Sequence, residues 1–196
     1  MVKELRERTG AGMMECKKAL VEADADMDAA VELLRKSGQA KADKKAGRVA
    51  ADGRIVVASA GATAVIVEVN SETDFVSKDD NFGHFAEAVA ASILTQNPAD
   101  LDAVGGLRLE DGRTVGEARA ELIAKVGENI GIRRFARVAS DDNVASYVHG
   151  SRIGAVVAYE GGDAEFGRDV AMHVSATNPL CISEADVPGE TLAAER

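Results

Sequence analysis

The side chains that could perform acid–base chemistry in this chain are few and scattered. Its three histidines, His84, His149 and His173, belong to no Ser/His/Asp order and to no H-E-x-x-H metal motif. A small hydrolase that uses His149 or His173 with an acidic neighbour is the enzyme that these residues would allow. Because no recognised catalytic constellation accompanies them, we predict that the protein is not an enzyme and has no catalytic residue.

Metal and cofactor chemistry has equally little support. Cys16 and Cys181 are far apart, and neither belongs to a C-x-x-C motif or a His/Cys cluster. Acidic residues between Glu72 and Asp80 suggest a calcium loop only weakly, because the alternating D-x-[DN]-x-[DN]-G spacing is missing and Phe75 lies in the middle. We therefore predict no cofactor and no metal ligand.

The same acidic segment is better suited to binding. Thr73-Asp74-Phe75-Val76 places a phenylalanine in a polar loop of a chain with only 4% aromatic residues. Burying such a side chain is worth about 1.5–3 kcal/mol, so an exposed Phe75 would be available as an aromatic anchor for a partner. In the alternative interpretation, Phe75 folds back onto its own sheet with Val76 beside it. Asp79 or Asp80 can cap the following helix in either case.

An internal repeat indicates that the fold does not require this loop. Two helical segments and their closing Asn-Pro pairs align at a constant offset of 81, namely residues 85–90 with 166–171 and residues 97–98 with 178–179. The preceding strands, 65–67 and 155–157, align at an offset of 90, so the first copy has nine extra residues within 70–81. A loop that the second copy lacks is a candidate for function.

The elements that position the loop follow from periodicity. Residues 1–38 are predicted to form a three-helix bundle that Gly38 closes as a C′ residue, and 39–53 a polar, partly helical linker or, less favoured, a basic patch for a partner. An α+β core with antiparallel sheets follows, divided into subdomains 54–139 and 140–196. We expect strands and helices in this order: a hairpin over 55–69, helices over 82–96 and 114–126, a strand over 130–138, a hairpin over 146–159 and a helix over 164–177.

Met13 and Met14 are the second candidate binding feature. At helical spacing Met13 aligns with Cys16 and Leu20, which predicts a core position, whereas Met14 is rotated off that stripe and is expected at the surface. An exposed, flexible thioether suits a groove on a partner. Arg6 and its neighbour Arg8 lie nearby and are ambiguous from the sequence alone.

Charge and hydropathy limit the partners and the compartment. The net charge is −10, divided into +2 over residues 1–48 and −12 over the remainder. An acidic body repels phosphate backbones, so we expect no direct nucleic-acid binding. Neither an apolar signal segment at the N-terminus nor an apolar run of membrane-spanning length is present in the sequence. We therefore expect a cytoplasmic protein without membrane contact.

Two long segments carry a family resemblance. Leu5-Arg-Glu-Arg-Thr-Gly-Ala-Gly-Met-Met-Glu-Cys-Lys-Lys-Ala-Leu20 and Glu68-Val-Asn-Ser-Glu-Thr-Asp-Phe-Val76 resemble the signature segments of bacterial translation elongation factor Ts. Lys125-Val-Gly-Glu-Asn-Ile130 and His149-Gly-Ser-Arg-Ile-Gly154 are also similar to that family. The resemblance extends over nearly the whole chain. It implies an N-terminal ubiquitin-associated-like bundle and a duplicated β-hairpin/helix core.

The resemblance also implies a function and a set of contact residues. Members of this family bind the GTPase elongation factor Tu with GDP and promote exchange for GTP. By this resemblance, Thr73-Asp74-Phe75-Val76 disturbs the partner's magnesium site, and Phe75 enters between partner side chains. His149 approaches the partner's phosphate-binding loop, and its nucleotide-binding domain is contacted by Arg6, Met13 and Met14. Met13 is then expected at the surface, against the helical spacing.

One departure and one alternative remain. Long family members continue past the region that matches residues 185–196 into a helical hairpin and further elements, so we expect the second subdomain to be incomplete. The alternative function is a non-catalytic adaptor that binds partners through the N-terminal bundle while the core is inert. An adaptor would not accelerate GDP release, whereas an exchange factor would depend on Phe75.

Overall fold

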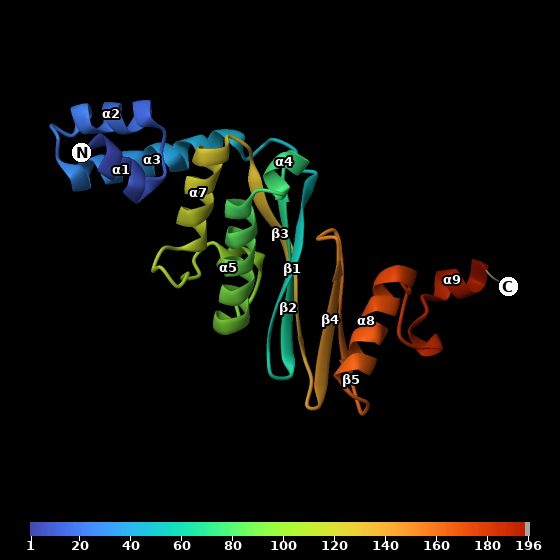
Figure 1. Cartoon of the computed structure of the whole chain (residues 1–196). Coiled ribbons are helices and arrows are strands. Elements are labelled where there is room, and N and C mark those ends of the chain that lie inside the picture. Colours follow the sequence, from blue (N-terminus) through green and yellow to red (C-terminus); the bar gives the residue numbers. More distant parts are fainter. Residues whose placement is uncertain (195–196) are drawn as a thin grey trace.

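The computed structural model describes residues 1–194. A helical N-terminal region precedes a mixed core whose sheets are antiparallel, which confirms the predicted α+β class (Figure 1). The core is layered: helices cover one face of a three-stranded sheet, and a two-stranded sheet with its own helix lies on the other side of it (Figure 1). This layering places the turns between elements at the molecular surface.

The N-terminal bundle consists of α1 (Val2–Thr9), α2 (Met13–Glu22) and α3 (Met27–Lys45). Gly10, in the left-handed conformation at φ 66°, ends α1, and the Asp26 carboxylate caps α3 by accepting from the Ala29 N–H at 2.8 Å. The side chains that form the small core of the bundle are Leu5, Cys16, Ala19, Leu20 and Ala30. The predicted apolar stripes therefore face one another as expected.

Gly38 does not end the third helix, so that prediction is wrong. α3 continues through Gly38 to Lys45, and Gly38 is buried where α3 crosses α7 (Val115–Val126). A Cβ at position 38 would lie 3.7 Å from the Ala120 carbonyl oxygen and 3.9 Å from the Ala124 Cβ. These are ordinary contact distances, so Gly38 lies at a packed helix crossing and does not reverse the chain. Residues 39–45 of the predicted linker are helical, and 46–51 connect α3 to the core.

The central sheet has the order β1 (Asp52–Ala60), β2 (Thr63–Ser71), β3 (Ile130–Ala139). Alternate β2 residues, Val65, Val67 and Val69, are fully buried against α5 (Asp80–Gln96) and α7. This pattern is what period-two alternation predicts for one covered face. The short helices α4 (Asp74–Ser77) and α6 (Leu101–Val104) lie in the connections before and after α5.

The second hairpin, β4 (Asn143–His149) and β5 (Ile153–Tyr159), packs on the other face of the central sheet. Gly154 marks the contact, since a Cβ there would lie 2.7 Å from Ile55 Cγ2 and 3.1 Å from Ile66 Cδ1. Helix α8 (Ala164–Thr177) packs against both strands of this hairpin. α5 and α8 end alike, with Asn97 and Asn178 at φ 47° and 45°, in agreement with the predicted repeat.

The final segment contributes little to the core. It contains a 3-10 turn (Glu184–Asp186) and α9 (Gly189–Ala194). Leu180 and Ile182 in this segment are 79% and 103% exposed. Among the helices of residues 1–194, none combines the length and the apolar character needed to cross a membrane.

Candidate partner-binding site

The extra loop of the first repeat folds as the single-turn helix α4, and Phe75 on it is 83% exposed. The interpretation in which Phe75 folds back onto the sheet is therefore wrong. Val76, which the sequence groups with the partner-contacting residues, is 9% exposed and belongs to the main core. Val76 thus supports the turn from below while Phe75 faces solvent. The predicted cap is confirmed at Asp79, whose carboxylate accepts from the Asn81 N–H at 2.9 Å.

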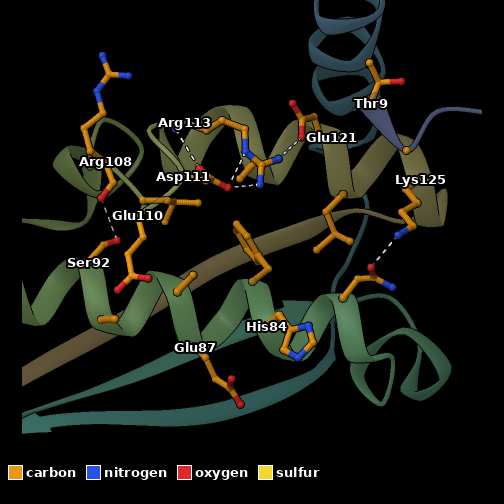
Figure 2. Close-up of a pocket in the computed structure, with 18 of the residues that line it drawn as sticks. Thr9, His84, Glu87, Ser92, Arg108, Glu110, Asp111, Arg113, Glu121 and Lys125 are labelled. Atoms are coloured by element: carbon orange, nitrogen blue, oxygen red, sulfur yellow. Dashed lines mark hydrogen bonds and ion pairs between the residues drawn. The ribbon is translucent and has the colours of Figure 1, made fainter. Parts of the chain in front are cut away.

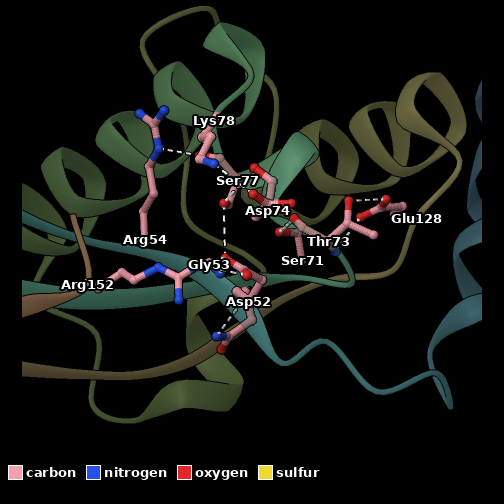
Figure 3. Close-up of polar contacts among 11 residues, drawn as sticks. Asp52, Gly53, Arg54, Ser71, Thr73, Asp74, Ser77, Lys78, Glu128 and Arg152 are labelled. Carbon is pink, nitrogen blue, oxygen red and sulfur yellow. Dashed lines mark hydrogen bonds and ion pairs between the residues drawn. The ribbon is translucent and has the colours of Figure 1, made fainter. Parts of the chain in front are cut away.

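The C-terminal end of α4 is anchored to the first strand. The Ser77 hydroxyl donates to an Asp52 carboxylate oxygen at 3.1 Å, and the Arg54 Nε donates to the Ser77 carbonyl oxygen (Figure 3). Ser77 itself is 4% exposed. These contacts hold the backbone of α4 two positions after Phe75.

The N-terminal end of α4 is anchored to the connection after α7. Thr73 precedes the helix, but its hydroxyl donates to Glu128 Oε1 at 2.6 Å instead of capping α4, and its backbone N–H donates to Glu128 Oε2 at 3.0 Å (Figure 3). The buried Ser71 hydroxyl donates to the Thr73 carbonyl oxygen at 2.9 Å. Both ends of the Phe75 turn are thus fixed by residues distant in sequence.

Asp74 is held more loosely. Its carboxylate pairs with the Lys78 ammonium at 2.7 Å, four residues later on the same segment (Figure 3). Exposed pairs of this spacing contribute about 0.3–0.5 kcal/mol. An incoming partner could therefore displace Lys78 and contact the carboxylate at little cost.

His149 lies at the end of β4, and its Nδ1 is 3.1 Å from the Tyr147 hydroxyl. The turn after it is tied to β1, because the Ile55 N–H donates to the Ser151 carbonyl oxygen at 2.6 Å. Arg152 in this turn pairs with the Asp52 carboxylate at 2.8 Å (Figure 3). Asp52 therefore bridges the His149 turn and α4, and the structure brings these two predicted contact segments to the same end of the sheet.

The bundle residues predicted to contact a partner are all exposed. Arg6 is exposed, and Met13 and Met14 are 60% and 72% exposed. The core position that helical spacing predicted for Met13 is wrong. Met13 is the first residue of α2, and helical side chains tilt toward the N-terminus, so its side chain extends past the start of the helix into solvent.

A surface pocket of about 920 Å³ lies elsewhere, between the end of α1 and the helices α5 and α7 (Figure 2). Several of its side chains pair with one another: Arg113 pairs with Asp111 and Glu121, and Lys125 donates to the Asn81 side-chain oxygen at 2.7 Å (Figure 2). The residues that line it include none of those predicted to contact a partner. The candidate site is therefore a set of surface protrusions.

Comparison with known proteins decides the family. Residues 72–196, which include the Phe75 loop, match the family model described as elongation factor TS. Over its whole length the chain is 60% identical to elongation factor Ts of Xanthomonas campestris pv. campestris (strain B100) and of Xanthomonas oryzae pv. oryzae (strain PXO99A), and covers 67% of each. Elongation factor Ts of Alcanivorax borkumensis is 58% identical, with 70% of it covered. The chain belongs to the elongation factor Ts family.

Membership in the elongation factor Ts family assigns the protein to translation elongation and leaves the roles of individual residues to the geometry. Sequence reasoning missed Asp52, Arg152 and Glu128, although the last two lie inside segments that resemble the family. The available signal was their position: Glu128 and Arg152 each follow a glycine beside a predicted strand end, and Asp52 directly precedes Gly53. Their hydrogen-bond and ion-pair partners, which lie at α4 and in β1, can be identified only from the fold.

Asp52 should make the stability of this elongation factor Ts chain pH-dependent. The Gly53 N–H, the Ser77 hydroxyl and Arg152 favour the carboxylate and lower the pKa of Asp52 below its ordinary value of 3.8. A lowered pKa contributes stability that is present above pH 3.8 and is lost as the pH falls through the folded-state pKa. We expect Asp52→Asn to lower the unfolding midpoint at pH 7, and the difference from the wild type to shrink as the pH falls below 3.8.

Thermal unfolding of both proteins between pH 7 and pH 2.5 measures this difference. Asp141→Asn is the matched control, because Asp141 is exposed and forms no hydrogen bond or ion pair within residues 1–194. A gap between Asp52→Asn and wild type that stays constant over the whole range would contradict the assignment.

Proposed function

We propose that this protein is a guanine-nucleotide exchange factor for elongation factor Tu, which binds the GDP complex in the cytoplasm and promotes GDP release and GTP loading. The observation that carries the proposal is the 83% exposed Phe75 on a turn anchored at both ends. An exposed phenylalanine on a fixed protrusion is suited to act as an anchor in a partner's pocket. Family membership supplies the link to translation elongation.

The proposed mechanism is a free-energy coupling between two ligands of the GTPase. If this factor weakens the hold of the GTPase on nucleotide, then nucleotide weakens its hold on the factor by the same ratio. Phe75 would enter a site that the nucleotide-free GTPase opens, and the adjacent Asp74 carboxylate would disturb the magnesium site after it releases Lys78. GTP binding would then expel the factor. These steps require no proton transfer or covalent chemistry from the factor.

The other exposed residues would supply contacts away from the loop. His149 lies on a turn that Asp52 connects to α4, so this turn and Phe75 can engage one partner together. We assign it to the phosphate-binding loop of the GTPase. Arg6, Met13 and Met14 project from the bundle and would contact the nucleotide-binding domain. The exposure of both methionines also suits a passive adaptor, which is the alternative function.

Release of labelled GDP from elongation factor Tu tests the proposal. We expect the release rate to rise with the concentration of this chain and to saturate as the complex forms. A bound complex that releases GDP at its intrinsic rate would favour the adaptor instead. Binding should be followed in parallel, by gel filtration or titration calorimetry, so that loss of binding and loss of stimulation are distinguished.

A further inference from the structure

Two carboxylates link the start of the Phe75 turn to the segment before β3. The Glu128 carboxylate accepts from the backbone N–H and the hydroxyl of Thr73, and the Glu72 carboxylate accepts from the Asn129 N–H at 2.6 Å. We call Glu72, Thr73, Glu128 and Asn129 the clasp. The pairing of β2 with β3 ends at the pair Ser71 and Ile130. The clasp residues lie directly beyond this pair, and their side chains connect the two segments further.

The turn depends on such outside support. A single helical turn is not stable by itself, because nucleating it fixes several residues for one hydrogen bond. Thr73 uses its hydroxyl on Glu128 and does not cap α4, and Phe75 makes few contacts of its own. At the other end Ser77 is tied to Asp52. Glu128 is therefore the main side-chain anchor on the N-terminal side of Phe75.

The clasp also reaches the segment that leads out of the N-terminal bundle. The Asn129 side-chain amide donates to the Arg48 carbonyl oxygen at 2.8 Å and to the Ala46 carbonyl oxygen at 3.4 Å. The Arg48 guanidinium lies 3.5 Å from the Glu72 carboxylate. Asn129 is only 6% exposed. The clasp therefore anchors both the Phe75 turn and the segment that leads out of the N-terminal bundle, the bundle that carries Met13 and Met14.

We infer that Glu128 is a positioning residue for exchange: it holds the Phe75 turn in its binding-competent pose before the partner arrives. The inference rests on the proposed function. It implies that loss of Glu128 reduces the fraction of molecules whose turn is correctly posed. The apparent dissociation constant rises in inverse proportion to that fraction, while a complex that has formed still carries Phe75 in place. Loss of Glu128 should therefore raise the half-saturating concentration of the factor and leave the maximal rate of GDP release unchanged.

The first test compares Glu128→Ala and Glu128→Gln in the GDP-release assay. We expect Glu128→Ala to raise the half-saturating concentration about tenfold, if roughly one turn in ten remains posed, and to leave the maximal rate nearly unchanged. Glu128→Gln should recover part of the loss, because its amide oxygen can accept from the Thr73 N–H while its amide N–H donates to the Thr73 hydroxyl. A fall in maximal rate with unchanged half-saturation would overturn the inference.

A second test needs no partner. Amide hydrogen exchange of residues 73–78 in the free chain should be several-fold faster in Glu128→Ala than in the wild type. The Thr73 amide donates to Glu128 itself, and the Ser77 and Lys78 amides donate to the Thr73 and Asp74 carbonyl oxygens within the turn. Glu110→Ala is the matched control, because Glu110 is exposed and forms no hydrogen bond within the described part of the chain. Equal exchange rates in Glu128→Ala and wild type would refute the positioning role.

The two tests separate failure of this inference from failure of the proposed function. A wild type that never stimulates GDP release refutes the exchange function, yet hydrogen exchange still reports on Glu128. A double-mutant cycle of Glu128→Ala with Thr73→Val shows whether the contact is direct. Coupling between the two changes supports the clasp, and full additivity of their effects on hydrogen exchange refutes it.

Discussion

Phe75→Ala is expected to reduce the stimulation of GDP release by roughly 30-fold or more, the loss associated with a binding hot spot of at least 2 kcal/mol. The fold should be unaffected, because Phe75 is 83% exposed and exposed substitutions usually change stability by less than about 0.5 kcal/mol. The maximal rate should fall, in contrast to Glu128→Ala, since the group that acts on the partner is then missing from the formed complex. Stopped-flow release of a fluorescent GDP analogue over a range of concentrations measures both quantities.

Phe166→Ala is the matched control for this change. Phe166 is 51% exposed and packs edge-on against Tyr159 at 5.9 Å, in the second repeat where the extra loop is missing. We expect stimulation to stay at the wild-type level. If Phe75→Ala stimulated release as well as the wild type, the anchor role would be excluded. If it retained full binding while neither protein stimulated release, the adaptor would be the better description.

Local patterns predicted most of the core elements. The bounds of α8 agree with those expected from periodicity, the second hairpin ends at Tyr159 as expected, and the first hairpin and the strand after α7 are present. These elements follow local rules: β-branched runs separated by turn residues, and apolar stripes closed by Asn-Pro. The repeat was detectable because the two copies share those closing residues, Asn97 and Asn178, in the same left-handed conformation.

The errors arose where tertiary contacts override a local signal. Glycine is typical of a helix terminus, but α3 continues through Gly38, which is buried against α7. Met13 has the spacing of a core residue, but its position at the start of α2 leaves nothing to cover it. The sequence alone does not show that α3 crosses α7 at Gly38, nor that Met13 lies at the edge of the bundle.

The candidate site was likewise predicted only in part. The repeat and the unusual Phe75 pointed to the loop without any structure, whereas its supports did not emerge. Glu128 is 55 residues from Thr73, and Arg152 is 100 residues from Asp52. Such pairs obey no periodicity, because chain reversals through whole elements bring them together. A loop can therefore be recognised from sequence while the residues that pose it require the fold.

Gly53→Ala is expected to have the largest effect on stability. Gly53 has φ 151°, and a Cβ there would lie 2.2 Å from the Val69 carbonyl oxygen and 2.8 Å from the Asn70 Cα. Both atoms belong to the backbone of the neighbouring strand, so neither can move aside cheaply. An unfavourable backbone conformation alone costs about 1–3 kcal/mol, and the overlap adds to it. We therefore expect a total loss of roughly 3 kcal/mol or more, measured by urea unfolding.

Gly61→Ala separates the two contributions. Gly61, in the turn between β1 and β2, also has a positive φ of 56°, but a Cβ there would meet nothing within 4 Å. Gly61→Ala should lower the free energy of unfolding only by the cost of placing alanine in the left-handed conformation, about 1–2 kcal/mol. The difference between the two variants then measures the close approach of β1 to β2 at Gly53. Equal losses would show that the two strands do not approach this closely.

The position of Gly53 gives this change a functional consequence as well. Its N–H donates to the Asp52 carboxylate at 2.8 Å, and Asp52 holds both Ser77 and Arg152. Displacing this backbone should loosen the Phe75 turn and the His149 turn together. Under conditions where Gly53→Ala remains folded, we expect the half-saturating concentration for GDP release to rise, while Gly61→Ala retains the wild-type value. Gly61→Ala is the control because Gly61 lies at the far end of the hairpin from Asp52. If the two variants differed in stability but had the same half-saturating concentration, Asp52 would not hold the two turns in place.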